Sequence, residues 1–207
     1  MIRRSTAPIL ASVLVALVVC AQARTLPGTP ESDKALNLCK SADRVTGSEK
    51  LLLLDRGLAL AEHAVAVDDA DAEGHFAVFC NLGREMQLRP LSLGSLGAVR
   101  RLRREIERAL DLAPDTTQVL VAKAMFLLEL PRFLGGDPIE AERLLHRAVE
   151  LDPAYASAHF ALARLFMTRN ERDAAAAQVQ AALSATGDGL SSSETVEAHT
   201  LLASIEP

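Results

Sequence analysis

Hydrophobic residues recur every three or four positions along most of this chain, and the same amphipathic pattern returns several times. In residues 147–166, RAVELDPAYASAHFALARLF, one such stretch ends at a proline and a second one begins. Apolar residues at this spacing share one face of a helix, and proline ends a helix because it lacks an amide hydrogen. We find no alternating pattern typical of strands. The sequence therefore predicts an all-α fold made of helix pairs.

Similar sequences mark the end of the second helix in each pair. They read AVAVDD from residue 64, ALDLAP from residue 109, AVELDP from residue 148 and AALSAT from residue 181. The intervals between equivalent alanines are 45, 39 and 34 residues, as in repeats of two helices that stack side by side. We expect about four such units and a C-terminal capping helix, over residues 31–69, 70–114, 115–153, 154–187 and 191–206.

Two insertions lengthen the second and third units, at residues 83–97 and 129–138. In the later insertion Asp137 precedes Pro138, and proline suits the first position of a helix because an amide hydrogen would have no partner there. An aspartate before that position can accept hydrogen bonds from the free amides of the first turn. We therefore expect a helix to begin at Pro138 with Asp137 as its cap.

The most regular unit lies near the C-terminus, and its small residues stand where two helices would cross closely. The repeated faces carry His159, Leu162, Ala163 and Phe166 on the first helix and Ala175, Val179 and Ala182 on the second. This pattern resembles the tetratricopeptide repeat (TPR), with His159, Ala163 and Phe166 where the family often has Trp, Gly and Tyr. The resemblance covers about residues 34–186. It implies a right-handed α-α superhelix, a solenoid whose first helices line the concave side.

In such a superhelix, the register of the repeats places a mostly apolar set of side chains on the concave side. The set comprises Phe76, Cys80, Val121, Met125, Leu128, Phe160, Arg164 and Met167. One interpretation is that the inserted segments or the terminal helix bury this stripe. The other is a groove for an apolar ligand or a partner helix, since large exposed apolar patches are uncommon without a use. In a groove, Arg164 would be suited to hold a carboxylate.

The N-terminus has the features of a secretory signal. Arg3 and Arg4 precede an apolar stretch of 13 residues, 7–19, and the small residues of AQA end at Ala23. This order is typical of a signal peptide over residues 1–23 that is cleaved after Ala23. The apolar stretch is too short for a transmembrane helix, which needs about 20 residues. We therefore expect export to the periplasm of a bacterium.

Cleavage at this site leaves a domain of residues 24–207 and changes its formal net charge from −5 to −7. An acidic chain is poorly suited to nucleic acid or to an anionic membrane surface, so we expect neither as a partner. Cys20 leaves a second possibility open, a membrane-anchored lipoprotein. The preceding LVV lacks the small residue found before a lipid-modified cysteine.

Two cysteines remain in the domain, Cys39 and Cys80, on the first helices of adjacent units. An oxidising compartment permits a disulfide between them. The alternative is that both are small buried residues with free thiols.

No motif in the chain predicts catalysis, a metal or a cofactor, so we expect a protein that is not an enzyme. The five histidines form no HExxH pair, and no group of cysteine and histidine has the spacing of a zinc site. His75 and His159 occupy equivalent repeat positions, and we expect each to pack between helices with one hydrogen bond.

The densest basic run is RRLRREIER at residues 100–108. Arg101 with Glu105, and Arg103 with Glu107, have the spacing of exposed ion pairs on one helix. The run is therefore interpreted as a solvated helix face, with a docking patch for an acidic partner as the alternative.

A short motif in the third unit adds a narrower resemblance. Its residues are Pro131, Gly135, Gly136, Asp137, Pro138 and Ala141. Together with the signal peptide and the acidic repeats, the motif is similar to periplasmic TRAP-transporter T-components. That resemblance implies an oligomeric accessory protein that binds a hydrophobic ligand and meets a periplasmic substrate-binding protein. The repeats alone favour a scaffold for protein–protein interaction in an envelope complex, with T-component-like ligand binding as the alternative.

Overall fold

The computed structural model describes residues 26–88, 95–185 and 189–205, and all regular elements in these ranges are helices. The α-helices of the described residues are α1 (Pro30–Ser41), α2 (Gly47–Val67), α3 (Ala72–Leu88), α4 (Ser95–Leu112), α5 (Thr117–Glu129), α6 (Pro138–Leu151), α7 (Ala156–Thr168), α8 (Arg172–Ser184) and α9 (Ser192–Ile205). Short 3₁₀ helices, η1 (Ala42–Arg44) and η2 (Arg132–Leu134), follow α1 and α5. The predicted signal peptide and Cys20 lie outside the described residues.

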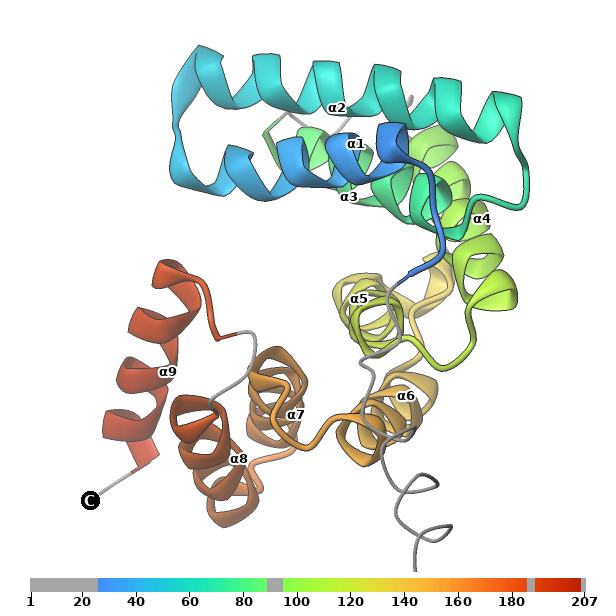
Figure 1. The fold of residues 1–207 in the computed structure, drawn as a ribbon. Helices are drawn as coiled ribbons and strands as arrows, with labels where there is room; N and C mark the ends of the chain where they lie inside the picture. The colour runs from blue at the N-terminus through green and yellow to red at the C-terminus, as the bar shows by residue number, and fades with distance from the viewer. Residues whose placement is uncertain (1–25, 89–94, 186–188, 206–207) are drawn as a thin grey trace, which may run out of the picture.

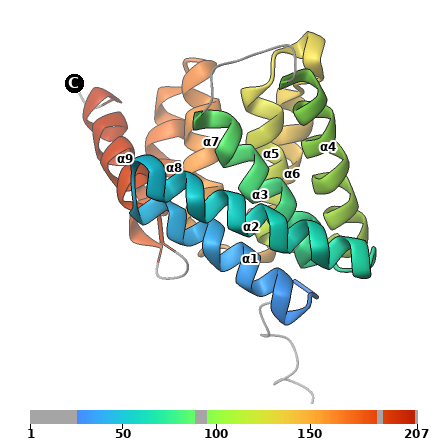
Figure 2. The same cartoon turned by 90° about the horizontal axis from the view of Figure 1, so that it is seen from above.

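The helices pack in chain order as pairs, α1 with α2, α3 with α4, α5 with α6 and α7 with α8, and α9 packs on α8. The first helix of each pair lies on the inner side of a curved stack and the second lies outside it (Figure 1). Seen from above, α1 and α2 cross obliquely in front of the later helices (Figure 2). The predicted all-α superhelix with a capping helix is confirmed.

Alanine occupies positions where neighbouring helices pack closely. Ala124, Ala141, Ala163 and Ala175, which the sequence places at helix crossings, are all fully buried. Helix axes come as near as about 8 Å only where the facing side chains are small. Larger side chains such as Leu162, 1% exposed, fill the space around these crossings. Alternation of methyl groups and larger side chains therefore determines how each pair nests against the next.

The hydrophobic core has two main parts that meet between α4 and α5. The N-terminal core, formed largely by α1 to α4, includes Phe76 and Ile106. The C-terminal core, formed by α5 to α7, includes Leu144 and Leu162. Leu110 near the end of α4 packs against both cores. The superhelix is thus one continuous stack with a seam at α4 and α5.

A polar contact crosses the same seam. Arg103 on α4 donates hydrogen bonds to the carbonyl oxygens of Leu134 and Gly135, at 3.0 and 3.1 Å. Its guanidinium carbon lies 5.8 Å from the ring centre of Phe126. Gly135 has a φ of 89°, and a Cβ atom there would also collide with Arg103. The predicted pairing of Arg103 with Glu107 is therefore wrong, because this arginine reaches the next unit instead.

The two insertions differ in structure. Asp137 caps α6 as predicted, since its Oδ1 accepts hydrogen bonds from the amides of Ile139 and Glu140 at 3.0 and 3.1 Å. The earlier insertion is helical in part, because α3 continues to Leu88 and α4 begins at Ser95. Part of the extra length of the second unit thus adds turns to its two helices.

A buried asparagine fixes the contact among α1, α2 and α3. Asn81 on α3 is fully buried, and its Nδ2 donates to the carbonyl oxygens of Ala35 at 3.2 Å and Ala77 at 2.8 Å. Its Oδ1 has no hydrogen-bond partner and faces Gly57 on α2, where a Cβ atom would collide with it. Gly57 is therefore required by close packing against an immobilised amide.

Replacing Gly57 with alanine should destabilise the protein by about 1–3 kcal/mol, the usual cost of overpacking a core. The reason is that Asn81 cannot move away without losing both of its hydrogen bonds. The measurement is chemical denaturation monitored by circular dichroism. Gly97→Ala on α4 is the matched control, because a Cβ there meets nothing within 4 Å. Gly97→Ala should be neutral or stabilise by up to about 1 kcal/mol; equal effects of the two changes would contradict this account.

Candidate functional site

The structure divides the predicted inner stripe into core side chains and accessible ones. Phe76, Val121 and Phe160 are 2, 3 and 2% exposed and belong to the hydrophobic clusters. The partly buried members are Cys80, Met125, Leu128 and Met167. Three of the large apolar side chains are therefore used in packing. The binding role proposed for the stripe stays a prediction.

Arg164, the cation of this stripe, is exposed and already lies near a carboxylate of its own chain. Its Nε is 3.6 Å from Oε1 of Glu197 on the capping helix α9. The pair joins α7 to α9. A carboxylate from a partner would have to compete with Glu197 for this arginine.

An open pocket of about 440 Å³ lies where the first helices of the first three units meet. Its wall comes from the first helices α1, α3 and α5 and from the segment before α1. Asp33, Lys40, Glu73 and Gln118 contribute polar groups, and Leu36 contributes an apolar side chain. Two carboxylates and one ammonium group thus line the same space. The sequence reasoning missed this pocket because its residues belong to no common repeat position.

The segment before α1 is held against the start of α3. The amide of Glu73 donates a hydrogen bond to the carbonyl oxygen of Pro27 at 3.0 Å. Gly28 passes so near Glu73 that a Cβ atom would collide with that side chain. Asp71, 3% exposed, accepts a hydrogen bond from the Thr29 hydroxyl at 2.9 Å. These contacts satisfy backbone amides and side chains at two helix starts, and they fix one wall of the pocket.

The carboxyl group of Glu73, which faces the pocket, has a pKa that is shifted from its ordinary value. Its partial burial, followed by the nearby charges of Asp33 and Asp71, raises the pKa of this carboxyl above its ordinary value. Lys40 acts in the opposite direction without reversing the shift. A carboxylate that is costly to ionise and faces an open space is typical of binding sites, because a bound group can relieve the cost.

Cys39 and Cys80 meet where α1 packs on α3, and both are free thiols in this structure. A hydrogen bond from Cys80 lowers the pKa of Cys39, with the positive charges of Arg84 and Lys40 helping. The same hydrogen bond and burial raise the pKa of Cys80 well above its usual value. The predicted disulfide stays a prediction, and the contact brings together the two sulfurs that it needs.

Within the described ranges, no group of three or more histidine, cysteine or acidic side chains is placed to hold a metal ion. No described helix is both long and apolar enough to cross a bilayer.

Comparisons with known proteins agree with this architecture. Residues 132–205 match the family model of the tetratricopeptide repeat. A crystal structure of TTC0263, a thermophilic TPR protein in Thermus thermophilus, has a TM-score of 0.58 at 18% identity, covering 83% of this chain and 91% of its own. MamA (41-end) from Desulfovibrio magneticus RS-1 has a TM-score of 0.54 at 15% identity, covering 86% and 84%. No curated protein matches the sequence.

These likenesses define the class of fold and leave the biochemical role to the site. Residues 132–205 match the repeat by sequence, and 83% of the chain matches a TPR protein by structure. At identities below 20%, structural similarity identifies the fold alone.

Glu73→Gln should raise the thermal midpoint at pH 7, because it removes a charge that the folded state penalises. The sign follows from the raised pKa of Glu73. Its ionisation costs folding free energy once the pH exceeds the unfolded value of about 4.3. At about pH 3 the carboxyl is neutral in both states, so the advantage of glutamine should vanish. Glu49→Gln, on exposed α2 surface, is the control and should change stability by less than about 0.5 kcal/mol. A lower midpoint for Glu73→Gln at pH 7 would contradict the reasoning.

Treatment with oxidised glutathione should convert the Cys39 and Cys80 thiols to a disulfide and transfer their two electrons to the glutathione disulfide. Intact mass should fall by about 2 Da relative to the reduced protein, and the bond should stabilise by about 2–4 kcal/mol through the loop it closes. The measurement combines mass spectrometry with denaturation before and after dithiothreitol. Cys39→Ser should abolish both effects; an unchanged mass in the parent protein under these conditions would reject the bridge.

Proposed function

We propose that this chain is a non-catalytic binding protein whose inner surface holds a segment of another protein. The observation that supports this most directly is the pocket between α1, α3 and α5, the first helices of three neighbouring units in a TPR-like stack. In such a stack the inner helices present a continuous surface that an extended or helical segment can follow. The groups facing the pocket can bind and orient a ligand, and they form no nucleophile and base pair.

The pocket favours a basic side chain of the partner. Asp33 and Glu73 both face this space with their carboxylates, and the charge of Asp33 adds to burial in raising the pKa of Glu73. A lysine or arginine of the partner would form charge-assisted hydrogen bonds with these carboxylates. Leu36 supplies an apolar wall for the methylene stem of such a side chain.

We also propose that the protein works in the cell envelope as a scaffold or adaptor. The support is the N-terminal sequence, in which Arg3 and Arg4 precede the apolar stretch 7–19 and the small residues up to Ala23. Sequencing the N-terminus of the protein recovered from the periplasm would test export, and an intact Met1 would reject cleavage.

A hydrophobic ligand of the T-component type is the second candidate function. Its support is the GGDP motif and the partly buried Met125 and Met167 on the inner side. The burial of Phe76, Val121 and Phe160 leaves less apolar surface for such a ligand. Native mass spectrometry of gently purified protein distinguishes the two functions, because a bound lipid-like molecule would favour this one.

Partner capture with the full mature chain as bait tests the first function. Glu73→Gln should weaken capture about tenfold, as expected when one charge-assisted hydrogen bond of about 1.5 kcal/mol is lost. The same variant should be more stable, so that weak binding cannot result from misfolding. Arg56→Glu on the exposed side of α2 is the control and should leave capture unchanged. If both variants capture every partner as well as the parent protein, the pocket is not the binding site.

A further inference from the structure

Two histidines at equivalent repeat positions have different surroundings. His75 lies on α3 of the second unit and His159 on α7 of the fourth. In both rings Nε2 faces a carbonyl oxygen in the turn before the helix, that of Asp69 at 3.1 Å and that of Pro153 at 3.0 Å. A carbonyl oxygen only accepts, so Nε2 carries a hydrogen in both rings. Each histidine makes a second hydrogen bond as well, one more than the sequence predicts.

The second hydrogen bond differs between the two units. Nδ1 of His159 lies 2.7 Å from Oε1 of the Gln178 side-chain amide. The oxygen and the nitrogen of an amide occupy nearly the same space when exchanged. An amide can be turned so that its nitrogen donates, and a neutral ring then satisfies both contacts. Nδ1 of His75 lies 2.7 Å from Oε2 of Glu105. An ionised carboxylate only accepts, so the His75–Glu105 contact requires one more proton than its counterpart.

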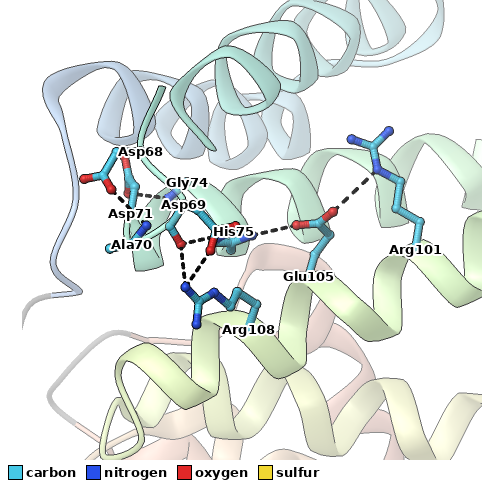
Figure 3. A network of polar contacts seen from close by, with 9 residues as sticks. All are labelled: Asp68, Asp69, Ala70, Asp71, Gly74, His75, Arg101, Glu105 and Arg108. Carbon is cyan, nitrogen blue, oxygen red and sulfur yellow. Dashed lines mark hydrogen bonds and ion pairs between the residues drawn. The ribbon is translucent and has the colours of Figure 1, made fainter. Parts of the chain in front are cut away.

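Charges on both neighbouring segments hold these acceptors in place, as Figure 3 shows. In the turn between α2 and α3, Oδ1 of Asp69 lies 3.6 Å from Nε2 of His75, and Arg108 binds Oδ2 at 2.6 Å. On α4, Arg101 lies 3.6 Å from Oε1 of Glu105, which is the predicted pair on this helix. Arg108 therefore orients the carboxylate of Asp69, and Arg101 orients that of Glu105.

The remaining charged groups around this cluster have partners of their own. Glu62 on α2 pairs with Arg101 at 2.6 Å. Asp68 and Asp71 accept hydrogen bonds from backbone amides at 2.9 and 2.7 Å. The groups that face the ring of His75 directly are therefore Glu105 and Asp69.

The sign of the pH dependence follows from these contacts. Burial alone would lower the pKa of His75, but the hydrogen bonds to Glu105 and to the Asp69 carbonyl, with both negative charges, raise it above the ordinary value. A histidine whose folded pKa exceeds the unfolded value of about 6.5 stabilises the fold fully below that pH. This contribution is lost as the pH rises through the folded pKa.

We propose that His75 and Glu105 form a proton-dependent clamp that holds the turn between α2 and α3 against α4 and loosens when rising pH removes the second proton of the His75 ring. The His159–Gln178 pair joins its helices in the same way, but it does not require a second proton on the histidine ring. Loss of the proton leaves a carboxylate facing a ring nitrogen that can no longer donate to it.

The acid and the amide at this equivalent position can be exchanged between the two repeats as an experiment. Glu105→Gln converts the clamp into the pair found in the fourth unit, and Gln178→Glu transfers the clamp to that unit. Histidine titrations by NMR on the full mature chain report each ring, and denaturation from about pH 5.5 to 9 reports stability across the range that brackets the ordinary pKa of histidine.

We expect Glu105→Gln to lower the titration midpoint of His75 by about one pH unit or more, the usual effect of losing an adjacent opposite charge. The difference in stability between the parent protein and this variant should shrink from pH 5.5 to pH 9. Gln178→Glu should raise the midpoint of His159 by a similar amount, which keeps the test decisive if Glu105→Gln folds poorly. An unchanged midpoint in either variant, or a stability difference that is the same at every pH, would overturn the clamp.

Discussion

Two helices can pack closely only where the facing side chains are small, and this chain places buried small residues at several of its predicted helix crossings. Ala124, Ala141, Ala163 and Ala175 are fully buried, and at Gly57 even a methyl group is excluded by Asn81. Because each pair of helices must nest on the next, these contacts set the curvature of the stack. The position of every inner side chain, and with it the pocket, depends on them.

The fold was predictable because burial repeats along the sequence with a helical period, and small residues return at the same place in each unit. The pocket was not predictable in this way. Asp33, Glu73 and Gln118 share no repeat position, and they line one space only because three helices and the segment before α1 meet there. Arg103 shows a second limit. Its spacing favoured a partner on the same helix, but a long side chain pairs according to tertiary structure, and the carbonyl groups of Leu134 and Gly135 lie within its reach.

The histidines show how repeats diverge in chemistry while their packing stays the same. The sequence placed His75 and His159 at equivalent positions, and the structure gives both rings the same carbonyl contact in the preceding turn. The residue that contacts Nδ1 of the ring differs between the two units: it is the amide Gln178 in the fourth unit and the acid Glu105 in the second. This exchange keeps the shape of the contact and adds a charge. Repetition thus allows one unit to acquire a titrating group without altering the helix geometry on which the stack relies.

The seam between α4 and α5 gives the molecule a particular mechanical character. Across the seam the two cores share Leu110, the hydrogen bonds of Arg103, the ring contact of Phe79 with Phe126, and Val119 of α5, which packs into the N-terminal core. In a linear array, elastic deformation concentrates where neighbouring modules share the least buried surface. Because α4 and α5 contact one another less extensively than the helices within a pair do, bending of the stack would be taken up at this seam first.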